Sequence, residues 1–169
     1  MKMLTFVVAL STLGFIGWVV TRTVASIQYD RGCGGHLKRA ADANTIDLAV
    51  LELEIAVKYL EANNMTSGYT SIIYQTPDED VGFFYSNLKA SLEELKGISP
   101  EATPLERSNI LMKLRETLLD NGERATVTTK PPGISIFPHN TKLFIWILTM
   151  GPTSIFFGTL RLLIWMENN

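Results

Sequence analysis

The sequence predicts an all-α membrane protein in which two transmembrane helices bracket a small soluble helical-bundle domain. Two apolar runs predict the membrane helices, one at residues 3–20 and the other at residues 143–166. A continuous apolar run of about 20 residues is long enough to cross a bilayer. The stretch between them, about 120 residues, is enough for one small domain. Because this stretch is polar, charged and helix-prone, we expect the bundle to lie between two membrane anchors.

This pattern divides the chain into four segments. We expect an N-terminal transmembrane anchor in residues 1–27 and a soluble helical domain in residues 28–122. A proline-rich extended connector then covers residues 123–140, and a C-terminal transmembrane helix covers residues 141–169. The single cysteine excludes an internal disulfide framework.

The N-terminal run has two interpretations, an uncleaved signal anchor or a secretory signal peptide removed on export. The run is longer than the apolar core of a signal peptide, which has about 7–15 residues. No small-residue cleavage site of the Ala-x-Ala kind follows it. Trp18 and Arg22 lie at its end, where an aromatic ring and a cation are typical anchors at the membrane interface. These features favour the signal anchor.

Residues 28–35 contain three glycines within four positions, and each disfavours a helix interior by about 1 kcal/mol. We therefore expect a turn or hinge between the anchor and the soluble domain. Apolar residues then recur every three or four positions across residues 36–63, which is typical of an amphipathic helix. Asn44 and Thr45 predict a restart, so that the main helix covers residues 45–63.

Two Thr-Pro-x-Glu segments, at residues 76–79 and 103–106, predict the starts of the next two helices. In such a capping box the threonine hydroxyl accepts from the backbone N–H three residues on, and the glutamate accepts from the threonine backbone N–H. Proline fits the first helical position, where its missing N–H costs nothing. An apolar stripe follows each box. The expected bundle therefore consists of helices at residues 45–63, 77–96 and 104–121, the second closed by Gly97 and the third by Asn121-Gly122.

Residues 123–140 change in character, with β-branched residues and three prolines. This composition predicts a short extended connector, with a small hairpin around Pro131-Pro132-Gly133 as an alternative. The second membrane helix then begins near Thr141.

The second apolar run carries two tryptophans and one charge. Trp146 and Trp165 are separated by roughly 28 Å along a helix at about 1.5 Å per residue, close to the thickness of the hydrocarbon core. We expect the two indoles to lie in opposite membrane interfaces. Arg161 either snorkels to the headgroups or has a buried partner or a role in a pore.

Gly151 and Pro152 lie near the middle of this run and predict a helix kink, because proline removes one helix hydrogen bond. Thr149 and Thr153 are candidates to bond the carbonyl that proline frees. Such a kink suits a packing partner or a gating hinge. The alternative is that prolines are simply more frequent in membrane helices.

Two groups of residues have the chemistry of metal ligands. Cys33, His36 and His139 lie near the two ends of the soluble domain and converge only if both ends return to one membrane face. Residues 78–80 are three consecutive acids, which capping and the helix macrodipole also explain. We expect no metal, no cofactor and no catalytic site, with a free thiol and two solvated imidazoles.

Aromatic residues are dense around the loop before residue 77 and the start of the helix that follows it. Tyrosine is enriched at protein interfaces, so these residues are candidates for binding a partner. The alternative is that they fill the core of the bundle. The candidates are Tyr69, Tyr74, Phe83 and Tyr85.

Composition excludes some functional classes. The net charge is −2 and no basic stripe is present, so we expect no nucleic-acid partner. The sequence has no Ser-His-Asp order, P-loop, dinucleotide fingerprint or HExxH motif. We expect a non-enzymatic, membrane-anchored scaffold or adaptor that binds another protein, a membrane complex or a second copy of itself. The alternative is an accessory subunit of a channel or transporter, or a small oligomeric pore, that uses the kinked second span and Arg161.

The orientation in the membrane follows from the positive charges. Most lysines and arginines near the membrane ends lie on the side of the soluble domain. The positive-inside rule therefore favours a cytoplasmic domain with both termini outside. Lys2, at the start of the chain, favours the opposite orientation.

Overall fold

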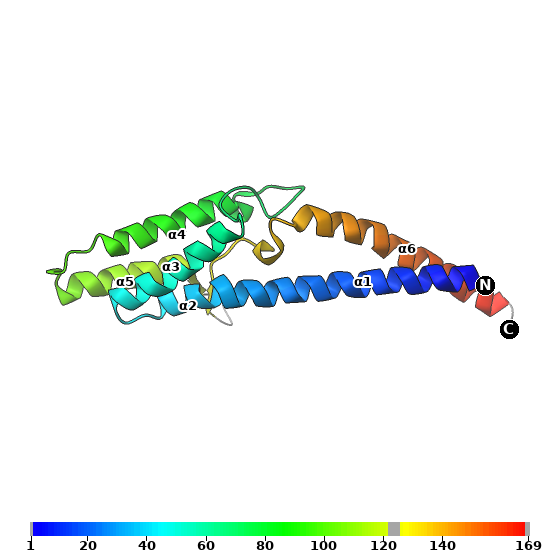
Figure 1. The fold of residues 1–169 in the computed structure, drawn as a ribbon, viewed down its shortest axis with the longest axis horizontal. Coiled ribbons are helices and arrows are strands. Elements are labelled where there is room, and N and C mark those ends of the chain that lie inside the picture. Colours follow the sequence, from blue (N-terminus) through cyan, green and yellow to red (C-terminus); the bar gives the residue numbers. More distant parts are fainter. Residues whose placement is uncertain (1, 122–125, 168–169) are drawn as a thin grey trace. The chain divides into compact units, whose positions relative to one another are not determined.

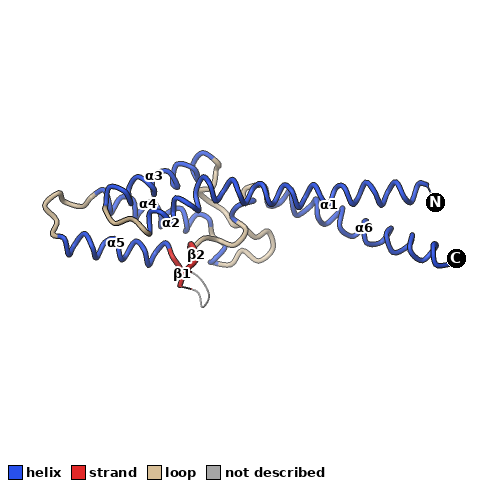
Figure 2. Tube along the Cα trace, turned by 90° about the horizontal axis from the view of Figure 1, so that it is seen from below, coloured by secondary structure: helices blue, strands red, loops and turns tan. Residues whose placement is uncertain are grey.

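The computed structural model describes residues 2–121 and 126–167, and these are predominantly helical (Figures 1 and 2). A π-helical turn covers Asp30–Gly34, and 3-10 turns cover Pro77–Glu79 and Ile134–Ile136. The α-helices are α1 (Lys2–Tyr29), α2 (Gly35–Ala41), α3 (Ile46–Ala62), α4 (Val81–Lys96), α5 (Pro104–Leu118) and α6 (Asn140–Glu167). Strands β1 (Leu119–Asn121) and β2 (Thr126–Thr128) pair antiparallel.

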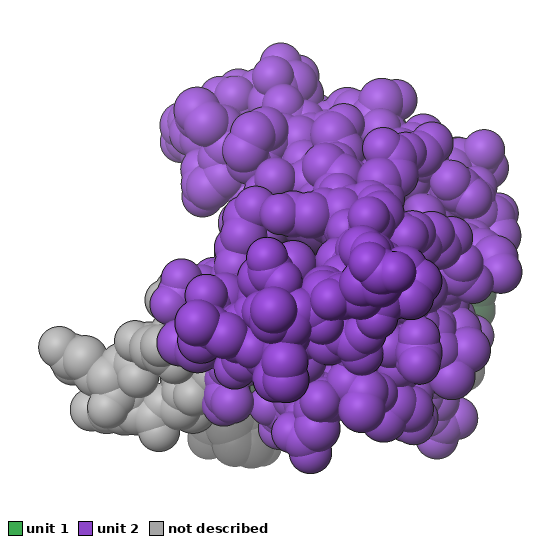
Figure 3. All heavy atoms as spheres, turned by 90° about the vertical axis from the view of Figure 1, so that its left-hand side faces the viewer, with its two compact units in different colours: residues 1–25, 139–169 green, residues 26–138 purple. Residues whose placement is uncertain are grey.

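The chain forms two compact units. Unit 1 contains residues 1–25 and 139–169, so it combines most of α1 with α6. Unit 2 contains residues 26–138, which include the helices that lie between α1 and α6 in the sequence (Figure 3).

In unit 1 the two apolar helices pack against each other antiparallel. The indole N–H of Trp18 donates to the backbone carbonyl of Leu143 at 3.0 Å. One turn earlier on α1, a Cβ added to Gly14 would lie 3.2 Å from Sδ of Met150, which is two turns further along α6. Earlier residues of α1 therefore contact later residues of α6, so the two helices run in opposite directions.

A seam of small residues on α1 makes this close approach possible. A Cβ added to Gly17 would lie 3.4 Å from Cζ2 of Trp146, so the Trp146 ring rests on a surface without a side chain. Ser11, one turn before Gly14, is only 4% exposed. Small residues let the backbones of membrane helices approach each other, and the gain is van der Waals contact.

Outside this seam, large apolar side chains of unit 1 point away from the protein. Two helices of the described chain, Met3–Ala41 and Asn140–Ile164, are long and apolar enough to cross a membrane, with mean hydropathies of 2.1 and 1.6 over their most apolar 18 residues. The residues with more than half of their surface exposed include Met3, Phe6, Leu10, Leu13, Ile16, Ile145, Leu148, Ile155, Phe156, Leu162 and Leu163.

The turn or hinge expected at residues 28–35 is wrong. Helical backbone continues from α1 through the π-helical turn into α2. The glycines instead permit close packing: a Cβ at Gly32 would lie 2.2 Å from Cδ2 of Tyr59, and one at Gly34 would lie 2.8 Å from Oδ1 of Asp30. Both distances are shorter than real Cβ contacts, so a side chain at position 32 would displace the Tyr59 ring and one at position 34 would displace the Asp30 carboxylate.

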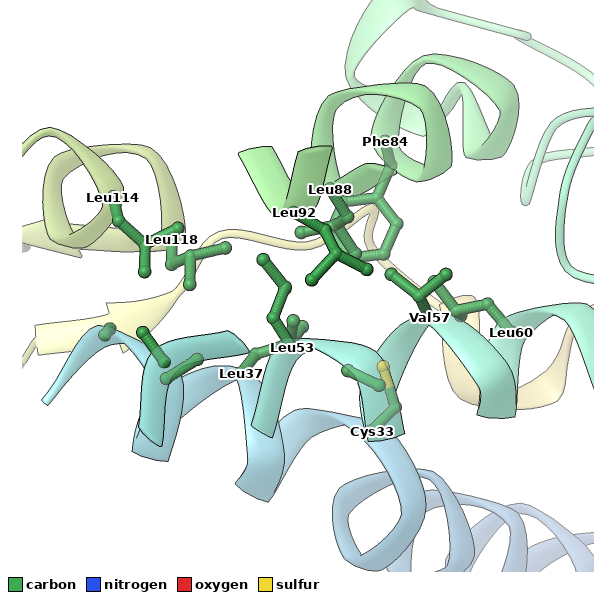
Figure 4. Packing of buried hydrophobic residues seen from close by; sticks show 14 of the residues in the cluster. Cys33, Leu37, Leu53, Val57, Leu60, Phe84, Leu88, Leu92, Leu114 and Leu118 are labelled. Carbon is green, nitrogen blue, oxygen red and sulfur yellow. The ribbon is translucent and has the colours of Figure 1, made fainter. Parts of the chain in front are cut away.

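The core of unit 2 is built by four helices, α2 to α5. α3 contacts α2, α4 and α5, and α2 also contacts α5. Figure 4 shows leucines of α4 and α5 directed toward Leu53 of α3, with Leu37 of α2 on the opposite side. The expected three-helix bundle therefore lacked α2, whose Leu37 and Ala40 are 0% and 1% exposed.

Local capping chemistry sets the helix starts. Thr103 and Glu106 form the expected capping box at α5, with the Thr103 backbone N–H donating to Glu106 Oε2 at 2.7 Å. Thr76 and Glu79 also form the box, but it closes the 3-10 turn Pro77–Glu79. α4 begins four residues later than expected, because Asp80 is its N-cap and accepts from the Phe83 backbone N–H at 3.0 Å.

The region after α5 differs from the expectation. α5 ends at Leu118, and the next three residues form β1 instead of a last helical turn. The antiparallel pair is formed by β1 and β2 rather than around residues 131–133, where Gly133 has a φ of 74° and leads into the 3-10 turn Ile134–Ile136. The predicted stop at Gly122 lies outside the described residues.

Candidate partner-binding surface

A buried glutamate of α3 forms the most enclosed polar cluster in the described chain. Glu52 has 5% of its side chain exposed, and its Oε2 lies 2.6 Å from Nδ1 of His36. Its Oε1 lies 2.6 Å from Nη2 of Arg39. His36 is therefore not the solvated imidazole that we expected. Both partners of Glu52 come from α2, so the cluster ties α2 to α3 and compensates the desolvation of the carboxylate.

Cys33 does not join His36 in a metal site. Its side chain is fully buried in the core of unit 2, and its thiol lies 3.6 Å from the hydroxyl of Tyr29. Within residues 2–121 and 126–167, no three His, Cys, Asp or Glu side chains come together as a metal site. Cys33 is a free thiol, as expected, and its burial makes it part of the packing of unit 2.

Two of the acids at residues 78–80 have capping roles. Glu79 accepts from the backbone N–H and the hydroxyl of Thr76, at 3.0 and 2.8 Å. Asp80 caps α4. Glu106 has the same capping role at the start of α5, where hydrogen bonds from the backbone and side chain of Thr103 lower the pKa of Glu106.

The four aromatic candidates have different environments. Tyr85 is half-buried, and its hydroxyl donates to Oε1 of Glu61 at 2.6 Å, which raises the pKa of Tyr85. Tyr69 is 37% exposed and pairs with Asp80 in an isolated β-bridge. Tyr74 and Phe83 are 79% and 67% exposed. The last two are therefore the candidates whose rings are available to a partner.

Phe83 borders a hollow of about 300 Å³ in unit 2, called here the Phe83 hollow. Its lining comes from α4, from Thr117 near the end of α5 and from the connector at residues 129–132. Apolar rings make up much of it, because Pro131 and Pro132 also line the hollow. A concave, mainly apolar site with a few polar groups is the usual form of a binding site.

Lys130 and Asp78 add opposite charges to the lining of the Phe83 hollow. Lys130 is held in place: its Nζ lies 3.2 Å from Oδ1 of Asp30 and 5.0 Å from the centre of the Tyr29 ring. These contacts fix the connector against the start of unit 2. The hollow thus has a positioned wall, which favours binding because little ordering is needed.

A second hollow, of about 480 Å³, lies where the start of α3 meets the loop between α4 and α5, at the end of unit 2 that Figure 3 shows. Its Arg107 donates to the backbone carbonyls of Pro100 and Ala102, at 2.5 and 3.1 Å. Arg107 therefore shapes this loop, and the hollow is more polar than the one at Phe83.

The membrane-anchoring candidates fall in unit 1. Trp18 and Trp146 take part in the helix–helix seam, and Arg22 lies 5.0 Å from the centre of the Trp18 ring. Arg161 is exposed on α6. The side chain of Trp165 lies outside the described residues. Their anchoring roles stay predictions.

The kink candidates lie inside α6, where Pro152 has no backbone N–H to donate to the carbonyl four residues earlier. The threonine hydroxyls do not bond the carbonyl that Pro152 frees, which belongs to Leu148. Thr149 donates to the carbonyls of Ile145 and Trp146, and Thr153 donates to those of Thr149 and Met150. The expected hydrogen bond from Thr149 or Thr153 to the freed carbonyl is therefore wrong for the described contacts.

The sequence interpretation missed an exposed apolar stripe on α3. Leu48, Leu51 and Ile55 are 51%, 53% and 37% exposed and lie on one face of the helix. The signal was available, since apolar residues at both 48–49 and 55–57 make α3 apolar over more than one face.

The chain was compared with protein families, curated proteins and solved structures. No protein-family model matches the chain, and no curated protein or solved structure matches it either.

Proposed function

We propose that the protein is a membrane-anchored, non-enzymatic adaptor. In this proposal α1 and α6 cross the bilayer as an antiparallel pair, and unit 2 binds another protein at the Phe83 hollow. The exposed ring of Phe83 at the border of a mainly apolar hollow is the observation that carries the binding role.

The surface of unit 1 supports the membrane part of the proposal. An exposed leucine or isoleucine costs about 1.5–3 kcal/mol relative to burial, and unit 1 exposes many such side chains on both helices. A contiguous apolar surface of this kind marks contact with a membrane or another protein. The small-residue seam supports the membrane over water, because close backbone packing is how helices associate in lipid.

The geometry of unit 2 supports a protein as the occupant of the Phe83 hollow. About 300 Å³ accommodates one or two side chains of a partner rather than a large cofactor. Aromatic anchors in such hollows often carry most of the binding energy. Asp78 and Lys130 would select a partner that presents polar or charged groups around an apolar anchor.

A photo-crosslinking amino acid at position 83 tests this function in the intact membrane. The matched control carries the same group at position 105, because Leu105 is 71% exposed on α5 and does not line the hollow. We expect a discrete protein adduct from position 83 that is absent from position 105. The same adducts from both positions, or none from position 83, would contradict the proposal. An adduct between two copies of this chain would replace the partner by self-association.

A further inference from the structure

The loop between α3 and α4 presents three consecutive large side chains to the outside. Ile72, Ile73 and Tyr74 are 37%, 65% and 79% exposed. We propose that this segment, residues 71–74, inserts into the headgroup region of the bilayer as a third membrane contact. The inference rests on the membrane anchoring in the proposed function and adds a lipid-binding site in unit 2.

The loop has a defined conformation that keeps these side chains out of the core. The hydroxyl of Ser71 accepts from the backbone N–H groups of Ile73 and Tyr74, at 3.4 and 3.2 Å. These bonds form a tight turn that satisfies backbone donors locally. The turn thus holds the apolar side chains outward, and the adjacent N–H groups already have partners.

The base of the loop is fastened to the start of α4. The backbone N–H of Thr70 donates to the carbonyl of Glu79 at 3.0 Å, and that of Val81 donates to the carbonyl of Gly68 at 2.8 Å. The apolar tip is therefore mounted on a fixed base.

The loop also packs against the residues that lead into α6. Gly68, with a φ of 101°, faces the ring of Phe137, whose Cζ would lie 3.3 Å from an added Cβ. α6 begins at Asn140, three residues after Phe137. Three residues span at most about 11 Å. The base of the loop therefore lies next to the point where the chain leaves unit 2 for the second membrane helix.

The composition of the loop suits a lipid interface. No Asp, Glu, Lys or Arg occurs from residue 62 to residue 77, although 19% of the chain is charged. Insertion therefore desolvates no charge, which is the main barrier to entering a bilayer. Tyr74 adds an amphipathic ring of the type that concentrates at membrane interfaces. The absence of charge, and the contact between the base of the loop and Phe137 close to the end of unit 2, favour lipid over a protein partner.

The experiment uses the full chain in nanodiscs, with single cysteines labelled by an environment-sensitive fluorophore. The variants are Ile73→Cys for the loop, Leu105→Cys as an exposed control in unit 2, and Ile16→Cys as a control on the predicted membrane helix. The native Cys33 is 0% exposed, so unmodified protein labelled in the folded state provides the blank. Brominated lipids quench probes in the bilayer, and iodide quenches probes in water.

We expect lipid quenching at position 73 to exceed that at position 105 by at least about three-fold, and iodide quenching to be correspondingly weaker. Iodide quenching at position 73 equal to that at position 105 would overturn the inference. Protection of position 73 from iodide without lipid quenching would also overturn it, because a second copy of the chain would then cover the loop. The control at position 16 distinguishes failure of the loop contact from failure of membrane anchoring. Lipid quenching there but not at position 73 refutes only the loop contact, whereas none at position 16 refutes membrane anchoring itself.

Discussion

Replacing Gly32 by alanine places a methyl group where the ring of Tyr59 lies. The new Cβ would be 2.2 Å from Cδ2 and 2.3 Å from Cε2 of that ring. Carbon atoms in contact are normally about 3.5–4.0 Å apart, so the ring has to move by roughly 1.3 Å or more. Tyr59 is half-buried and its ring meets that of Tyr29 edge-on, with centroids 6.1 Å apart. The displacement therefore spreads into the core of unit 2.

The expected cost of Gly32→Ala follows from two opposing effects. Overpacking a filled site costs about 1–3 kcal/mol. Alanine in place of glycine in a helix gains up to about 1 kcal/mol. We expect unit 2 to lose about 1–2 kcal/mol of unfolding free energy, which lowers its melting temperature by about 4–12 °C. A hinge at this position predicts the opposite sign, because alanine would then only stiffen the helix.

The assay uses Cys33, the single cysteine of the chain, as a reporter of unfolding. A fluorogenic maleimide reacts with this buried thiol only when unit 2 opens, so its fluorescence during heating gives the melting temperature. Tyr59→Ala provides the matched background, in which the methyl group at position 32 has free space. There we expect Gly32→Ala to be neutral or stabilising. A Gly32→Ala protein that melts at or above the wild-type temperature with Tyr59 present would refute the packing argument.

Three further predictions concern the cap of α5, Arg161 and the orientation of unit 2. Thr103→Ala removes the α5 capping box and is expected to cost about 1 kcal/mol in the same thermal assay, whereas Ser108→Ala on the exposed face of α5 should change the melting temperature little. Arg161→Leu should leave cross-linking from position 83 unchanged; a change of conductance in reconstituted vesicles would instead support the alternative of a pore or channel subunit. A membrane-impermeant maleimide should label Glu101→Cys only after cell lysis if unit 2 is cytoplasmic, and labelling of intact cells would reverse the orientation. Cys33 cannot serve as that probe, because it is buried in the folded protein.

Elements controlled by neighbours in the sequence were predictable. The box at Thr103 and Glu106 places both partners within one turn, and α5 starts where it predicts. The end of α3 is also set locally: the helix was expected to end at residue 63 and ends at Ala62, two residues before Asn64, which takes the left-handed conformation with a φ of 56°. The apolar runs gave the two long helices for the same reason, since each consists of one uninterrupted stretch of sequence.

Features that depend on distant residues were not predictable. Three glycines within four positions favour a hinge until the ring of Tyr59, 27 positions after Gly32, explains why residue 32 has no side chain. Glu52 looks like a residue of a polar helix face, and only the fold shows that α2 covers it. Which aromatic rings are exposed also depended on the fold. Phe83 and Phe84 are adjacent in sequence, but only Phe84 is buried.

The hydrogen bond between Trp18 and Leu143 joins residues separated by 125 positions, and it lies within unit 1. As long as α1 and α6 stay associated, unfolding of unit 2 therefore releases a closed loop rather than a free chain. Closing a loop of this length removes about 4–5 kcal/mol of conformational entropy from the unfolded state. The helix pair thus acts on unit 2 as a non-covalent cross-link, and residues 26–138 excised from the chain are expected to be less stable by up to that amount.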